Sequence, residues 1–218
     1  NYYPLEDYKY SIAKTNLSDL QANLGINYKL FEGLTADIKY MYERQTAENN
    51  QIVGIKSYEA RSLINYFTQI DRTSGKIKYA IPMGDILKHS SSALQTNNIR
   101  AQLNYNKSFH RHSIAAIVGA ESRQTLVDGY GNTSYGYNPS TLLSAKVDLI
   151  NPYPTIISGA GNVVPGGESF TKTLNRYVSF YGNAAYSFAT KYIFTVSGRR
   201  DASNLFGVNT NNKWNPLW

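Results

Sequence analysis

The sequence predicts an all-β protein, and more narrowly a segment of a transmembrane antiparallel β-barrel with long extracellular loops. Three observations support this fold class. Apolar and polar residues alternate with a period of two over long stretches. Each stretch is long enough to supply the roughly 9–11 residues of a tilted strand that crosses a bilayer. Short turns alternate with very long connections, as periplasmic turns and extracellular loops do in outer-membrane barrels.

The first hairpin is predicted over residues 18–30 and 35–43. In both ranges every second side chain is mainly apolar and the residues between are mainly polar, which is the pattern of a strand with two unlike faces. The turn between them is short and contains Gly33, a residue type that adopts positive φ at little cost. We therefore expect a hairpin with long arms.

Two further hairpins repeat this unit. The second is predicted over residues 98–108 and 112–121, and the third over residues 176–188 and 192–201. Both have short polar turns. The six expected strands are about twice as long as the five or six residues typical of globular proteins. Tyr and Phe residues gather toward the strand ends, where the aromatic girdles of a membrane barrel lie.

Long connections separate the hairpins, over residues 44–97 and 122–175. Both are rich in Asn, Ser, Gly and Tyr, and loops on the order of 50 residues are rare in compact soluble domains. Within the first connection, the pattern of residues 58–70 fits either a short helix or a strand. We expect both connections to be extracellular loops.

Composition excludes several other classes of protein. The chain has 218 residues and no cysteine, so it contains neither disulfides nor Cys-ligated zinc sites. Its net charge is +7, but the basic residues are scattered, which argues against nucleic-acid binding. Tyr is in excess, with 19 residues against 8 Phe and 2 Trp. Tyrosine suits positions where one end of the side chain is dry and the other is wet.

Alternation alone does not distinguish a lipid-facing strand from a strand of a soluble β-sandwich. Sandwich strands are shorter, with turns about every 8–12 residues, so strand length favours the barrel. Six strands are fewer than the eight or so of the smallest known barrels. We therefore expect residues 1–218 to form part of the wall of one larger β-barrel domain.

Two strings go beyond simple alternation: Asn-Arg-Tyr-Val-Ser-Phe-Tyr-Gly-Asn at 175–183 and Ser-Gly-Arg-Arg-Asp-Ala-Ser-Asn-Leu-Phe-Gly at 197–207. Both resemble segments of the SusC/RagA family of TonB-linked outer-membrane transporters of Bacteroidetes. Residues 58–65, 119–121 and 216–218 resemble the same family in the same order. The resemblance covers most of the chain and is most specific at 197–207.

The resemblance implies a barrel of about 22 strands with an internal plug. It also implies the bacterial outer membrane as the location, and TonB-driven import of glycans or peptides as the function. The expected partners are the rest of the same barrel and its plug, a SusD-like surface lipoprotein, outer-membrane lipid, and TonB. TonB would act through an amino-terminal part, because neither a TonB box nor a plug occurs in this sequence. The chain is therefore expected to be a middle part of the barrel wall, with no cofactor.

Candidate functional residues lie at the polar positions of the strands, which would line the lumen and contact water, plug or solute. These are Lys29, Asp37, Lys39, Glu43, Arg100, Glu121, Arg199 and Asp201. In the second long connection, aromatic side chains are candidates for stacking on sugar rings or contacting the lid protein. They are Tyr130, Tyr135 and Tyr137. Packing within the wall or the loop is the simpler interpretation of each residue.

Catalytic and metal sites are not predicted. His110 and His112 flank a turn, and a metal site needs three or four ligands. No nucleophile elbow or dinucleotide fingerprint occurs, so an enzyme is not expected. Two other functions remain open: a secreted soluble β-sheet protein that binds carbohydrate through Tyr-rich loops, and a surface adhesin or structural barrel piece without TonB dependence.

Overall fold

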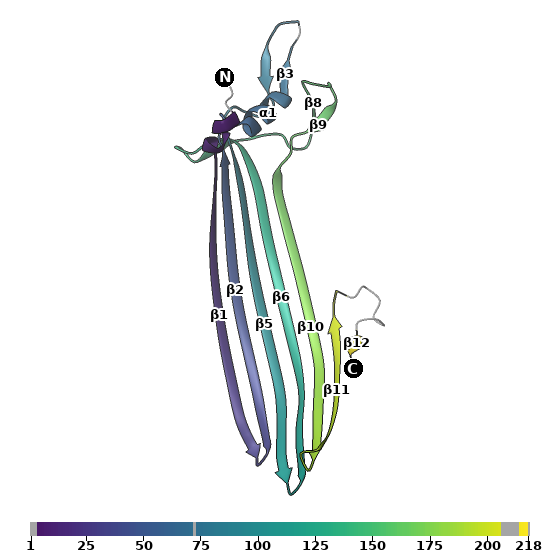
Figure 1. The fold of residues 1–218 in the computed structure, drawn as a ribbon. Helices are drawn as coiled ribbons and strands as arrows, with labels where there is room; N and C mark the ends of the chain where they lie inside the picture. The colour runs from purple at the N-terminus through teal and green to yellow at the C-terminus, as the bar shows by residue number, and fades with distance from the viewer. Residues whose placement is uncertain (1–3, 72, 206–213, 218) are drawn as a thin grey trace. The chain divides into compact units, whose positions relative to one another are not determined.

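The computed structural model describes residues 4–71, 73–205 and 214–217 and is dominated by one antiparallel sheet. Its long strands lie in the order β1-β2-β5-β6-β10-β11, and the short β12 pairs with β11 (Figure 1). The long strands are β1 (Ser11–Phe31), β2 (Leu34–Val53), β5 (Asp85–Phe109), β6 (His112–Asn138), β10 (Gly167–Phe188) and β11 (Tyr192–Ser203). Long strands that follow one another in the chain are neighbours in the sheet, joined by a short turn or a longer connection. The sheet is therefore built from hairpins.

Short elements surround these strands. They are the 3-10 helix η1 (Pro4–Tyr10), the helix α1 (Tyr58–Tyr66), and the strands β3 (Thr68–Ile70), β4 (Ile77–Tyr79), β7 (Leu143–Ala145), β8 (Pro152–Pro154), β9 (Gly161–Val163) and β12 (Trp214–Leu217). β3 pairs with β4, β8 pairs with β9, and β7 pairs with β6. The pattern of residues 58–70 fitted either a short helix or a strand, and the structure has both: α1, and then β3 one residue later.

The long strands extend well beyond the ranges expected from alternation. β2 continues to Val53 and β6 to Asn138, while β5 begins at Asp85 and β10 at Gly167. The connections therefore span only residues 54–84 and 139–166, instead of 44–97 and 122–175. Alternation weakens in the extensions because neither face there is uniformly apolar, whereas the backbone hydrogen bonds of a sheet do not depend on side-chain type. A hydrophobic period marks only the part of a strand that has an apolar face.

Contacts divide the chain into two compact units. The loop unit comprises Asn1–Ser18, Thr46–Ser92 and Gly129–Thr171, and the strand unit comprises Asp19–Gln45, Ala93–Asp128 and Lys172–Trp218. All buried hydrophobic side chains of the described residues belong to the loop unit. They are Val53, Ala60, Ile64, Phe67, Ile81, Ile86, Tyr135 and Val164. The loop unit thus has a core of the kind found in soluble proteins, and the described strand unit has none.

Helix α1 forms in the loop unit for local reasons. Ser57 precedes it in an extended conformation, and its hydroxyl accepts a 3.1 Å hydrogen bond from the Ala60 amide. This N-cap satisfies an amide that has no partner within the helix. Ala60 and Ile64 lie four residues apart, so both point into the core. The helix is short, and burial of this face stabilises it.

Candidate functional site

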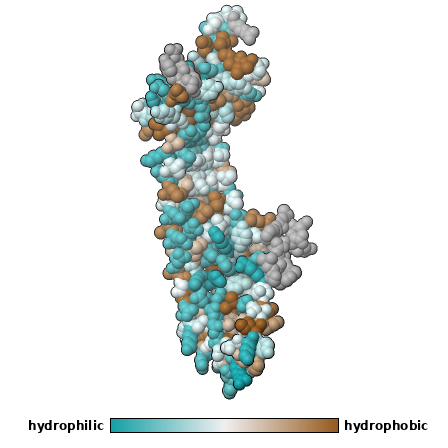
Figure 2. Space-filling model, in the orientation of Figure 1, coloured by the Kyte–Doolittle hydropathy of each residue, from teal (hydrophilic) through white to brown (hydrophobic). Residues whose placement is uncertain are grey.

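The strand unit presents two unlike faces. On one face, apolar side chains at alternating positions are exposed: Leu24 is 69%, Ile38 47%, Leu103 40%, Val118 57% and Phe180 51% exposed. Such a large exposed apolar area marks contact with protein or membrane. The residues between them are mostly polar and form the opposite face. Figure 2 shows mainly hydrophilic residues on the visible side of the strands of this unit.

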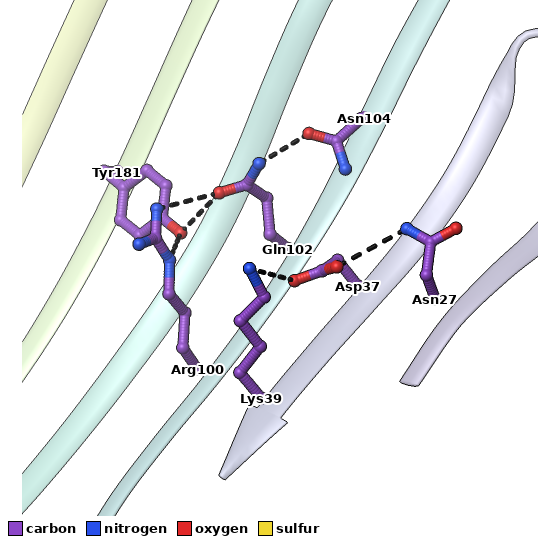
Figure 3. Close-up of polar contacts among 7 residues, drawn as sticks. All are labelled: Asn27, Asp37, Lys39, Arg100, Gln102, Asn104 and Tyr181. Atoms are coloured by element: carbon purple, nitrogen blue, oxygen red, sulfur yellow. Dashed lines mark hydrogen bonds and ion pairs between the residues drawn. The ribbon is translucent and has the colours of Figure 1, made fainter. Parts of the chain in front are cut away.

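A polar network on the second face centres on Tyr181, which projects from β10 (Figure 3). The Arg100 Nε donates a hydrogen bond to the Tyr181 hydroxyl at 2.7 Å, and that hydroxyl donates to Gln102 Oε1 at 2.8 Å. Arg100 Nη2 also donates to Gln102 Oε1 at 3.0 Å, and Gln102 donates onward to Asn104. The Arg100 guanidinium carbon lies 5.1 Å from the centre of the Tyr181 ring. The network therefore connects β10 to β5, with β6 between them.

Gly119 in β6 makes this reach across a strand possible. A Cβ atom at Gly119 would lie 2.5 Å from both the Cζ and the hydroxyl oxygen of Tyr181, and 2.9 Å from the Ala101 carbonyl oxygen. These distances are shorter than any ordinary van der Waals contact. The Tyr181 ring thus lies over the backbone of Gly119, where any side chain would displace it.

Five of the remaining lumen candidates also form local pairs on this face. Lys39 Nζ lies 3.6 Å from Asp37, whose carboxylate accepts a hydrogen bond from Asn27 at 3.4 Å. Arg199 forms an ion pair with Asp201 at 2.8 Å. The same arginine donates to the Ser179 hydroxyl at 3.1 Å, and Asn98 donates to Glu121 at 3.1 Å. Lys29 is exposed and Glu43 is half-buried.

These pairs limit what the face does chemically. Most of the charged candidates face an opposite charge or a polar neighbour, and the eight together comprise four cations and four anions. Exposed ion pairs of this kind contribute little to stability, about 0–1 kcal/mol each. Sequence analysis missed Tyr181 and Gln102, although both occupy the same alternating positions as Arg100 and Arg199. Their alternating positions already placed them on the polar face, but neither side chain is charged, and the candidates there were all charged residues.

The loop unit contains a cleft of about 780 Å³. Its lining comes from α1, the beginning of β5, the end of β6, and the segment 156–166. Tyr58, Leu63, Tyr66 and Ile156 supply apolar surface, and the Lys88–Glu59 ion pair supplies charge. A largely apolar cleft with a few polar groups is the usual form of a small-ligand site.

The three candidate tyrosines lie in β6, not in a loop as expected. Tyr135 is buried, and its hydroxyl donates a hydrogen bond to the Pro165 carbonyl. Tyr130 donates to Glu168 at 3.2 Å, and its ring centre lies 5.3 Å from that of Phe170. Tyr135 also lines the cleft described above, whereas Tyr130 and Tyr137 are absent from its lining. Of the three, Tyr135 is the one that contributes to this cleft.

Asp148 organises the connection between β7 and β8. Its carboxylate accepts hydrogen bonds from the Asn151 side chain at 2.7 Å and from the Ile150 and Asn151 amides at 2.9 and 3.1 Å. These bonds favour the charged form, led by the bond from the Asn151 side chain, and lower the pKa of Asp148 to about 2. The carboxylate thereby holds a turn in the chain.

Within residues 4–71, 73–205 and 214–217, no three His, Cys, Asp or Glu side chains gather in a way that would hold a metal ion. In the same part of the chain, no helix has the length and apolar character needed to cross a membrane.

Comparison with known proteins gives a sequence relative and a set of structural neighbours. Over 109 residues, 49% of this chain, the sequence is 31% identical to TonB-dependent receptor P3 of Formosa agariphila (strain DSM 15362 / KCTC 12365 / LMG 23005 / KMM 3901 / M-2Alg 35-1). The chain spans 10% of that relative's length. No family model matches.

The structural neighbours include three structures of RagAB, described as a peptide importer in "open-open" and "closed-closed" states and as a peptide transporter. Their TM-scores are 0.66, 0.66 and 0.67, at 15% sequence identity. Each match covers 95% of this chain and 19 or 20% of the other. The chain has the fold of a β-barrel wall segment. Half of its sequence is related to a TonB-dependent receptor, and its structural neighbours are named as transporters rather than enzymes.

Proposed function

We propose that this chain is part of the wall of a TonB-dependent importer in the bacterial outer membrane. The importer takes up glycans or peptides and works with a SusD-like lipoprotein at its outer mouth. The chain spans a tenth of its sequence relative and a fifth of its structural neighbours, so this activity belongs to a longer protein. The finer assignment to the SusC/RagA family rests on the sequence resemblance and is part of the proposal.

One observation carries the proposal: the strand unit has an exposed apolar face and an opposite face of paired polar groups. In a soluble sandwich the apolar face would be covered, yet Leu24, Ile38 and Phe180 are about half exposed or more. In a barrel wall the apolar face meets lipid and the polar face meets the lumen. In the secreted carbohydrate-binding alternative, this apolar surface would be left in water.

Spin labels test the two faces. The chain has no cysteine, so Leu103→Cys and Gln102→Cys each introduce a single labelling position within this segment of the full-length protein. In vesicles, we expect the label at position 103 to collide mainly with oxygen dissolved in lipid. The label at position 102 should collide mainly with a water-soluble nickel complex. Equal accessibility at both positions would contradict a membrane wall.

Surface labelling of intact cells tests the orientation of the connections. Ile150→Cys lies in the connection after β6, where Ile150 is 85% exposed, and Thr190→Cys lies in the turn between β10 and β11. A membrane-impermeant maleimide should label position 150 on intact cells and position 190 only after permeabilisation. Labelling of position 190 on intact cells would contradict the proposed orientation and indicate the opposite one.

Uptake tests the function. Cells with the full-length protein should accumulate fluorescent oligopeptides or oligosaccharides, and the same cells without TonB should not. If uptake were equal in the two strains, the protein would be a passive pore or an adhesin, and the proposed importer function would be wrong.

A further inference from the structure

A second cleft lies in the strand unit, between the β5–β6 turn and the β10–β11 turn. It has a volume of about 720 Å³ and is lined by residue 108 and residues 110–113 and 187–192. The Ala189 amide donates a 2.6 Å hydrogen bond to the Arg111 carbonyl, so the two turns are tied together by backbone. We call this the turn cleft.

The lining of the turn cleft is basic and lacks any carboxylate. Arg111 and Lys191 supply two cations, and His110 and His112 supply two imidazoles. The hydroxyl groups of Ser108, Ser113, Ser187 and Thr190 complete the polar surface. Neither Arg111 nor Lys191 forms an ion pair among the described residues, and both are exposed. Glu32, on the neighbouring β1–β2 turn, is not part of the lining.

An aromatic cluster adjoins the turn cleft. The His112 ring lies 5.2 Å from Phe109 and 5.1 Å from Phe188, measured between ring centres. His112 Nδ1 and the Tyr186 hydroxyl are hydrogen-bonded at 2.6 Å. Next to them on β11, Tyr192 is 71% exposed. Aromatic residues of this kind concentrate where a membrane barrel meets the headgroup region.

The two observations together specify a ligand with two chemically different parts. The two cations of the turns suit a phosphate, because arginine and lysine bind phosphate oxygens through charge-assisted hydrogen bonds. The aromatic side chains suit an apolar group attached to it. We propose that the turn cleft binds the phosphate headgroup of a membrane glycerophospholipid, whose acyl chains lie against the aromatic cluster and the apolar face above it. This proposal rests on the membrane placement proposed above.

Native mass spectrometry of the full-length protein with phosphatidylglycerol tests this site. The test variant is Arg111→Gln with Lys191→Gln. The matched control, Lys76→Gln with Lys78→Gln, removes two exposed cations from the loop unit. The loss of two basic contacts should lower lipid retention on the order of tenfold in the test variant. Retention by the control should equal that of the wild type.

Two further variants test whether charge in the cleft determines lipid retention. Arg111→Lys with Lys191→Arg keeps both charges and should retain the lipid. Ser187→Asp keeps both cations, adds a carboxylate to the cleft and should lower retention. Equal loss in the test and control variants would overturn the proposal. It would also be overturned if inorganic phosphate displaced the lipid as effectively as a second phospholipid, because the cleft would then bind only a free anion.

Flotation with vesicles separates this proposal from the function on which it rests. A wild-type protein that fails to float would contradict the membrane placement itself. A wild-type protein that floats, but whose lipid retention is unaffected by the Arg111 and Lys191 changes, would contradict only the lipid site.

Discussion

Replacing Gly119 by alanine should break the polar network that connects β10 to β5. The added Cβ would lie 2.5 Å from the Tyr181 hydroxyl oxygen, so the ring must leave its position over β6. The Ala101 carbonyl oxygen at 2.9 Å belongs to the backbone and cannot move away easily. We therefore expect Gly119→Ala to remove the hydrogen bonds between Tyr181 and its two partners, Arg100 and Gln102.

The magnitude follows from those two hydrogen bonds. A bond to a charged group contributes about 1.5–3 kcal/mol and a neutral one about 0.5–1.5 kcal/mol when buried. Arg100 is exposed and Tyr181 only half-buried, so solvent replaces part of each bond. We expect Gly119→Ala to lower the free energy of unfolding by roughly 1–3 kcal/mol. Gly198→Ala is the control, because nothing lies within 4 Å of a Cβ at that position.

The assay is urea unfolding of the full-length barrel in vesicles, monitored by the gel mobility difference between folded and unfolded protein. Gly119→Ala, Tyr181→Ala and the double variant form a mutant cycle. Once Tyr181 is truncated, the added methyl group should cost little more than the Ala101 contact. A coupling energy of about 1 kcal/mol or more is expected. Additive effects, or equal effects of Gly119→Ala and Gly198→Ala, would refute the crossing of Tyr181 over the glycine.

Three other predictions follow from the structure. Leu24→Arg on the apolar face should cost about 2–4 kcal/mol in a vesicle refolding assay, whereas Asn23→Arg should cost much less, and equal costs would contradict the assignment of faces. Ala189 and Thr190 both have positive φ, at 51° and 58°. Replacement by Asn-Gly should therefore raise the unfolding free energy by roughly 0.5–2 kcal/mol, and lower stability in urea would argue against this turn geometry. Asp148 has a pKa lowered from 3.8 to about 2, so its stabilisation is complete above the unfolded value and declines as the pH falls from 3.8 toward 2. The stability difference between wild type and Asp148→Ala should shrink over that pH interval, and a difference that grew as the pH fell would contradict the sign.

The sequence pattern was sufficient to predict a feature of the structure where one residue and its near neighbours decide the conformation. Gly33 has a φ of 89° in the first turn, as expected for a short hairpin connection. Leu24 and Asn23 occupy opposite faces because adjacent strand residues point in opposite directions. Lys39 and Asp37 form an ion pair because residues two apart on a strand share a face.

Sequence determined that this protein forms long two-faced strands arranged in hairpins, because the hydrophobic period is local. Tertiary structure alone decided which polar residues meet. Tyr181 and Arg100 lie 81 positions apart and touch only because β10 and β5 flank the same strand and Gly119 leaves room between them. It also decided how far the strands extend and that Tyr135 is buried. Backbone pairing and core packing depend on neighbours that are remote in sequence. The hydrophobic period of a single strand therefore does not predict which residues those neighbours are.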